Sequence, residues 1–225
     1  MPCALPFVPD LELAEAASLA YDDPTFVCQN LSARVVERGG RFIVSWAGSN
    51  DGEDWLQNFS AMLVARMGRG KIFNGFADQG DCVKAPFLSF IQSFPGPFEV
   101  STHSAGASPG LQCAAWMAEI GLKVNKVQLL AGPTIWDQVG AAYYRSFKIP
   151  TLRIGMYRDP VAALPGPHCG GAYEAPMLVL DDDGHERECQ DLPPDWWLPG
   201  LIADAAKEHP VGRYIRAVRM FTENA

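Results

Sequence analysis

The stretch "FEVSTHSAGASPG", Phe98 to Gly110, passes from a short apolar run directly into small residues around one serine, Ser104. A nucleophilic serine needs an exposed hydroxyl on a tight turn between a strand and a helix, small neighbours, and backbone N–H groups that hold an oxyanion. The small residues that follow meet this requirement, and the amide of Ala105 is well placed as one donor. A serine in an ordinary polar loop remains the alternative, because Thr102 stands where the G-x-S-x-G pattern has its first glycine.

From this stretch onward, strand-like apolar runs alternate with helical patterns. The expected elements are a strand over Phe98–Thr102, a helix over Ala105–Gly121, a strand over Val124–Ala131, a helix over Trp136–Phe147 and a strand over Thr151–Tyr157. This alternation predicts right-handed crossovers and an α/β fold with a mainly parallel central sheet and helices on both faces.

The rest of the chain shows helical and hairpin patterns. The expected elements are a helix over Leu11–Tyr21, a hairpin around Gly39–Gly40, a helix over Ala77–Phe94 that kinks or restarts at Pro86, a hairpin turning at Asp183–Gly184, and a helix from Leu201 that is broken near His209–Pro210.

Length and composition predict a single domain spanning 1–225. The chain has 225 residues, of which 48% are hydrophobic and 20% charged. Its net charge of -8 and its lack of Lys and Arg clusters argue against a nucleic-acid partner. Its apolar runs are too short to cross a membrane, and its oligomeric state is left open.

The start of the chain, "MPCALPFVPDLELAEAASLAY", lacks both a basic leader and a continuous apolar core. We therefore expect a cytoplasmic location, with secretion by another route as the alternative. The six cysteines could form up to three disulfides, but without a secretory signal we expect reduced thiols.

A serine nucleophile needs a histidine base and a carboxylate that orients it, in the chain order Ser, Asp, His for a hydrolase on such a sheet. Asp159 comes just after the strand "TLRIGMY", at the same edge as Ser104, although an aspartate before a proline is also common in turns. The side chain of His103 should point away from its neighbour's hydroxyl, either as packing or as support for the turn. Among the four histidines, His209 is the base by elimination, with a surface histidine as the alternative.

With these residues in view, the chain resembles the class 3 lipases, the fungal-lipase-like branch of the α/β-hydrolase fold. The resemblance runs over roughly Leu11 to Tyr214. It is carried, in the family's order, by "FIVSWAGSNDGEDWLQN", "KIFNGF", "VSTHSAGA", "KVQLLAGP", "RIGMYRDPVAALP" and "HPVGRY".

By position, the resemblance implies that Ser104 is the nucleophile, Asp159 the acid and His209 the base of a lipase or esterase that needs no metal or other cofactor. It further implies a second oxyanion donor at Ser49. The remaining implied positions are a short lid at about 50–58, with Asn50, Trp55 and His103 as lid or substrate-binding residues. Departures from the family pattern are Ala47, Phe73 and Pro109.

The implied substrate is a carboxylic ester or lipid, with transient contact to a lipid surface as an option. The expected lid segment "SNDGEDW" carries three acidic residues, which favours soluble or short-to-medium-chain esters over long-chain triglycerides. One alternative is a catalytically inactive binding module with the same fold. Another is a small zinc site, for which the candidates are His168, Cys169, His185 and Cys189.

Overall fold

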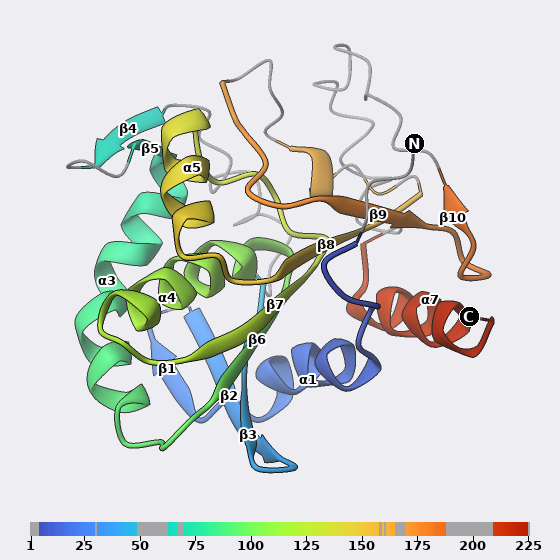
Figure 1. Ribbon diagram of the computed structural model, residues 1–225, viewed down its shortest axis with the longest axis horizontal. Helices are drawn as coiled ribbons and strands as arrows, with labels where there is room; N and C mark the ends of the chain where they lie inside the picture. Colours follow the sequence, from blue (N-terminus) through green and yellow to red (C-terminus); the bar gives the residue numbers. More distant parts are fainter. Residues whose placement is uncertain are drawn as a thin grey trace.

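The computed structural model describes residues 5–29, 31–48, 63–66, 70–157, 159, 161–164, 170–187 and 209–224. At its centre is a mixed sheet of eight strands in the order β1-β2-β3-β6-β7-β8-β9-β10 (Figure 1). The strands are β1 (Phe26–Cys28), β2 (Leu31–Arg38), β3 (Arg41–Trp46), β6 (Phe98–His103), β7 (Val124–Leu130), β8 (Thr151–Met156), β9 (Met177–Leu180) and β10 (Glu186–Arg187).

The five central strands, β3, β6, β7, β8 and β9, run parallel to one another. The hairpin of β1 and β2 at one edge and β10 at the other pair antiparallel to their neighbours. Because the carboxyl ends of parallel strands meet at one edge of a sheet, the segments that follow β3, β6 and β8 come together there.

Two layers of helices cover the sheet, so the predicted α/β fold with helices on both faces is confirmed (Figure 1). One layer packs α1 against α7, and the other contains α3, α4 and α5. The helices are α1 (Leu11–Asp22), α3 (Asn74–Ile91), α4 (Ala107–Glu119), α5 (Gln138–Ser146) and α7 (Val211–Asn224).

Helix α3 is continuous through Pro86, where the sequence predicts a kink or a restart. Proline removes the N–H group that would normally bond the carbonyl four residues earlier, which here belongs to Cys82. The thiol of Cys28 donates to that carbonyl oxygen at 3.4 Å, so strand β1 supplies the missing donor. A tertiary contact that the local pattern does not contain therefore satisfies the carbonyl that the proline leaves without a helical donor.

The stretch "KIFNGF" includes the end of β5 (Gly70–Phe73), which leads directly into α3 but lies outside the main sheet. It pairs with β4 (Leu63–Arg66) in a separate two-stranded sheet. The side chain of Asp137 accepts from the N–H of Lys71 at 2.9 Å and from that of Gly140 at 2.8 Å. This carboxylate both caps α5 and ties it to the hairpin, so the helix begins at Gln138.

The described C-terminal part agrees with the sequence-based expectation, whereas positions 201–208 of the predicted helix lie outside the described residues. Strands β9 and β10 form the predicted hairpin, and Gly184 in its turn has a φ of +76°. Helix α7 starts at Val211, just after the predicted break at His209–Pro210. Among the described helices, none combines the length and the apolar character that a membrane span requires.

Candidate active site

Ser104 occupies the turn between β6 and α4. Its φ of +57° lies in a region that residues other than glycine rarely adopt, and it opens a 3₁₀ turn over Ser104–Gly106. A Cβ atom on Gly106 would lie 2.5 Å from the carbonyl oxygen of Trp46 and 2.6 Å from that of Ala47. Only glycine therefore lets the turn pack against the end of β3. Strained backbone of this kind concentrates at functional sites, which makes the turn a candidate for one.

The threonine that replaces the first glycine of the G-x-S-x-G pattern is accommodated by a second glycine. A Cβ atom on Gly110 would lie 2.3 Å from the Cγ2 methyl of Thr102. The helix α4 thus leaves room for the larger side chain of the strand. Pro109 is the third residue of the same helix, a position whose N–H has no intrahelical acceptor, so the proline removes no helical hydrogen bond. Both departures from the family pattern are compatible with the turn.

Asp159 follows β8 and its side chain is buried. One carboxylate oxygen, Oδ1, accepts from the backbone N–H of Val161 at 2.9 Å. The other, Oδ2, accepts from the hydroxyl of Tyr214 at 2.7 Å and lies 2.7 Å from Nδ1 of His209. Donors directed at both oxygens compensate the loss of hydration and hold the carboxylate in one orientation.

His209 lies two residues before the start of α7, and the structure brings it to the predicted carboxylate. Because an ionised carboxylate only accepts, Nδ1 of His209 carries the proton that is donated to Asp159. In the neutral ring this leaves Nε2 as the basic nitrogen. The ring of His209 also lies against the ring of His103, with centroids 4.8 Å apart. Since His103 directly precedes Ser104, the three predicted residues lie at one edge of the sheet.

The side chain of His103 is buried, and both of its ring nitrogens contact protein groups. Nδ1 lies 2.7 Å from the hydroxyl of Tyr21, and Nε2 lies 2.9 Å from the carbonyl oxygen of His209. Burial and the neighbouring His209 hold the pKa of the imidazole well below its usual range, so the ring is neutral. This arrangement fits support of the turn and does not favour contact with a substrate.

Tyr21, which contacts Nδ1 of His103, also binds the segment that follows β3. Its hydroxyl accepts from the backbone N–H of Gly48 at 2.8 Å. Gly48 itself lies against the turn, because a Cβ atom placed on it would be 2.7 Å from Cβ of Ser104. Burial raises the pKa of Tyr21 to about 12, so the hydroxyl keeps its proton.

No role for Tyr21 or Tyr214 was predicted from the sequence. Tyr21 is one apolar position in the repeat of the first helix, and no local signal connects it to His103, 82 residues away. Tyr214 has a weak signal, since it stands five residues after His209 in the block "HPVGRY". On a helix that starts at Val211, this spacing directs it back toward the sheet edge.

Several predicted positions lie outside the described residues. They are Ser49, Asn50 and Trp55 of the oxyanion and lid segment, and His168, Cys169 and Cys189 of the alternative zinc site. Ala105 is described; it is buried in the 3₁₀ turn, and amides at the start of a helix have no intrahelical acceptor.

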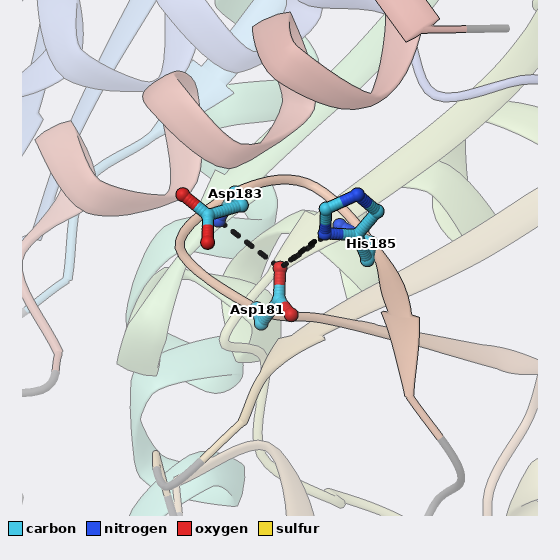
Figure 2. Close-up of side chains that lie close together, drawn as sticks. All are labelled: Asp181, Asp183 and His185. Atoms are coloured by element: carbon cyan, nitrogen blue, oxygen red, sulfur yellow. Dashed lines mark hydrogen bonds and ion pairs between the residues drawn. The ribbon is translucent and has the colours of Figure 1, made fainter.

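In the part of the chain that the structure describes, one group of side chains has the spacing of a metal site. Asp181, Asp183 and His185 have ligand atoms within 4.8 Å of one another, in the turn between β9 and β10 (Figure 2). Oδ1 of Asp181 accepts from the backbone N–H groups of Asp183 and His185, at 3.0 and 2.9 Å, and Oδ2 accepts from Arg187 at 2.7 Å. The Asp181 carboxylate thus serves the hairpin turn, and the group lies in a solvated hairpin rather than at the site of Ser104.

Comparison with known proteins gives a family match. Residues 43–168 match the model of the family described as Lipase (class 3). This range contains the segment after β3, the turn with Ser104, and Asp159. No curated protein was similar enough to count as a match.

Solved structures with the same fold are lipases of low sequence identity. The Rhizomucor miehei lipase propeptide complex has a TM-score of 0.63 at 19% identity, covering 78% of this chain and 68% of its own. A lipase from Rhizopus microsporus var. chinensis has a TM-score of 0.64 at 16% identity, with 76% and 72% covered. A triacylglycerol lipase whose catalytic centre is a serine protease triad has a TM-score of 0.60 at 21% identity, with 69% and 64% covered. At these identities the likeness establishes the fold.

Proposed function

Because the chain belongs to the class 3 lipase family, it is a carboxylic ester hydrolase, and we propose that it cleaves its ester through Ser104, His209 and Asp159. The reaction is two-step acyl transfer. The triad that forms the catalytic centre of the related triacylglycerol lipase is the chemistry we extend to this chain.

In the first step, Nε2 of His209 takes the proton of the Ser104 hydroxyl while its oxygen attacks the ester carbonyl. Asp159 holds the imidazole in the required tautomer and stabilises the imidazolium that forms. The amides of Ala105 and Ser49 stabilise the oxyanion. His209 then protonates the leaving alcohol, and water attacks the acyl-enzyme with His209 again as base, which releases the acid and restores Ser104.

One observation carries this proposal. Nδ1 of His209 donates to Oδ2 of Asp159 at 2.7 Å, at the sheet edge where Ser104 is held at a φ of +57°. The three residue types lie on segments far apart in sequence, in the order Ser, Asp, His that the fold requires. A turn aspartate and a surface histidine would have no reason to meet at this edge of the sheet.

The test is labelling with a serine-directed fluorophosphonate, followed by intact-mass analysis and peptide mapping. We expect one adduct, on Ser104, and none in the folded Ser104→Ala variant. The variant should also lose nearly all ester hydrolysis. A folded wild-type protein that neither reacts nor hydrolyses esters would contradict the proposal and would favour an inactive binding module.

For the substrate, we propose soluble or short-to-medium-chain esters. A lipase that acts on an oil surface presents a broad apolar area around its site, whereas the segment "SNDGEDW" has three acidic residues. Rates on p-nitrophenyl esters of increasing acyl length should peak at short or medium chains. A peak at long chains, with activation by an oil–water interface, would contradict this preference.

A further inference from the structure

A chain of hydrogen bonds runs beside the proposed triad without including its members' side chains. It begins at the backbone N–H of Gly48, which donates to the hydroxyl oxygen of Tyr21 at 2.8 Å. It continues over 2.7 Å from that hydroxyl to Nδ1 of His103, and over 2.9 Å from Nε2 of His103 to the carbonyl oxygen of His209. The chain therefore connects the segment after β3 with the backbone of the proposed base.

For a neutral His103 ring, the hydrogen-bond partners determine where the protons of this network lie. A carbonyl oxygen only accepts, so Nε2 of His103 must carry a hydrogen and donate it to His209. A neutral imidazole has one N–H, so Nδ1 is the acceptor and the hydroxyl of Tyr21 is its donor. The amide of Gly48 then donates to a lone pair of the same hydroxyl. Every group in the chain is satisfied by one arrangement of protons, and the reversed arrangement is excluded.

The pKa shifts agree with this arrangement. Burial, together with the neighbouring His209, holds the pKa of His103 well below its usual range, which keeps the ring neutral. Burial raises the pKa of Tyr21 to about 12, which keeps the hydroxyl protonated. Both side chains therefore keep the proton that the geometry assigns to them.

Both ends of this series of hydrogen bonds, at Gly48 and at His209, lie where a small displacement would affect catalysis. Gly48 lies against the Ser104 turn, since a Cβ atom on it would be 2.7 Å from Cβ of Ser104, and it precedes the oxyanion donor Ser49. At the other end, the carbonyl that His103 binds belongs to the residue that carries the proposed base. Fixing these two backbone groups holds the end of the segment after β3 and the backbone of the proposed base next to the Ser104 turn.

We infer that Tyr21 and His103 are positioning residues for ester hydrolysis. They hold the backbone groups of Gly48 and His209 in fixed positions around Ser104. The inference rests on the proposed function. Neither side chain touches the reacting atoms. The hydroxyl of Tyr21 should therefore matter more in the transition state than in the bound substrate, because misaligned oxyanion donors and bases lower the rate of the chemical step.

The experiment compares Tyr21→Phe with Tyr144→Phe in kcat and KM on a short-chain p-nitrophenyl ester. Tyr144 is a matched control, because its buried hydroxyl also has one side-chain partner, Thr151 at 2.8 Å, at the start of β8 and away from the site. Tyr21→Phe should lower kcat about tenfold and change KM less than about twofold, a fraction of the loss from a deleted oxyanion donor. Tyr144→Phe should leave both kcat and KM within about twofold, even if its thermal midpoint falls as much as that of Tyr21→Phe.

Substitutions of His103, alone and together with Tyr21→Phe, provide the second measurement. His103→Leu removes both contacts and should lower kcat at least as much as Tyr21→Phe, whereas His103→Gln, which offers one donor and one acceptor, should recover part of the loss. In the double variant of Tyr21→Phe with His103→Leu, the two decreases in kcat should not multiply, because both substitutions interrupt the same series of hydrogen bonds.

The outcomes separate this inference from the proposed function. A wild-type protein without a fluorophosphonate adduct and without esterase activity would overturn both. A wild-type protein that is labelled on Ser104, with Tyr21→Phe and His103→Leu both folded and within about twofold of its kcat, would overturn the inference alone.

Discussion

The hydroxyl of Tyr214 and Nδ1 of His209 donate to the same atom, Oδ2 of Asp159, each at 2.7 Å. Burial and the adjacent Asp159 charge raise the pKa of Tyr214 well above its ordinary value, so the hydroxyl keeps its proton. It also accepts from the backbone N–H of Met156 at 3.2 Å. Tyr214 thereby ties the carboxylate to the end of β8.

Replacing this tyrosine tests whether the carboxylate needs its second donor. In Tyr214→Phe, Asp159 loses one hydrogen bond and the amide of Met156 loses its acceptor. We expect the free energy of unfolding to fall by about 1–3 kcal/mol. The value of kcat should fall about tenfold, less than the roughly 10⁴-fold expected for Asp159→Asn, because the histidine keeps its partner. Urea unfolding and esterase kinetics give the two values, and an unchanged kcat in a folded variant would argue against this role.

A second buried pair holds the loops around Asp159. Arg153 on β8 and Glu174 form an ion pair at 2.6 Å in which both side chains are almost fully buried. The same guanidinium also donates to the carbonyl oxygens of Gly132 and Ala162, the latter three residues after Asp159. Arg153→Met leaves the Glu174 carboxylate buried without its partner, so we expect a loss of about 3–5 kcal/mol in the free energy of unfolding.

The double variant separates the charge from the packing. Arg153→Met with Glu174→Gln removes both charges, so it should recover part of the loss of Arg153→Met, measured by urea unfolding with linear extrapolation. The carbonyls of Gly132 and Ala162 still lack their donor in the double variant. A double variant less stable than Arg153→Met would show that the buried charge is not the main cause.

His103 predicts a dependence of stability on pH. The titratable side chains that face its ring are Tyr21, His209 and Tyr214. Its pKa is held well below the ordinary value of 6.5 in the folded protein, so the unfolded chain binds the proton first as the pH falls. The free energy of unfolding should therefore decrease below about pH 6.5, by up to about 1.4 kcal/mol per pH unit, and this contribution is flat at higher pH.

The difference between wild type and His103→Gln isolates this contribution, since glutamine does not titrate. Unfolding free energies of both proteins at pH 5 to 8 should converge toward acid pH. A constant difference over that range would mean that the buried ring takes up a proton as readily as an exposed one.

The order of elements and the three proposed catalytic positions follow from local patterns in the sequence. The strand before Ser104 and the strand before Asp159 are both short apolar runs, and parallel strands bring their carboxyl ends together. His209 follows by elimination, since the sequence has only four histidines. These inferences needed only periodicity, chain order and residue chemistry.

Contacts between distant segments could not be predicted in this way. Tyr21 lies 82 residues from His103, and its helical repeat carries no sign of a polar partner. Of the kink or restart predicted at Pro86, the restart is wrong, because α3 is one helix over Asn74–Ile91. The rule for proline considers one helix only, and the donor for Cys82 comes from Cys28 on a strand. In both cases the deciding hydrogen bond crosses between elements.

The contact between Thr102 and Gly110 gives the last prediction. Alanine is a better helix former than glycine by about 1 kcal/mol, so Gly110→Ala would stabilise an isolated helix. In this protein the added Cβ would lie 2.3 Å from the Thr102 methyl, so one of the two elements must move. We therefore expect Gly110→Ala to lower the free energy of unfolding by about 1–3 kcal/mol, in the range for an overpacked core.

Thr102→Ser removes the clashing methyl and keeps the hydroxyl, so it is the matched background for this substitution. There the same Gly110→Ala change should have an effect near zero or be stabilising, and the two substitutions should couple by at least about 1 kcal/mol in urea unfolding. Equal losses in the two backgrounds would mean that alanine is excluded by something other than Thr102. Coupling of the expected sign would show that the threonine at the first position of the G-x-S-x-G pattern depends on a glycine one helical turn beyond Gly106.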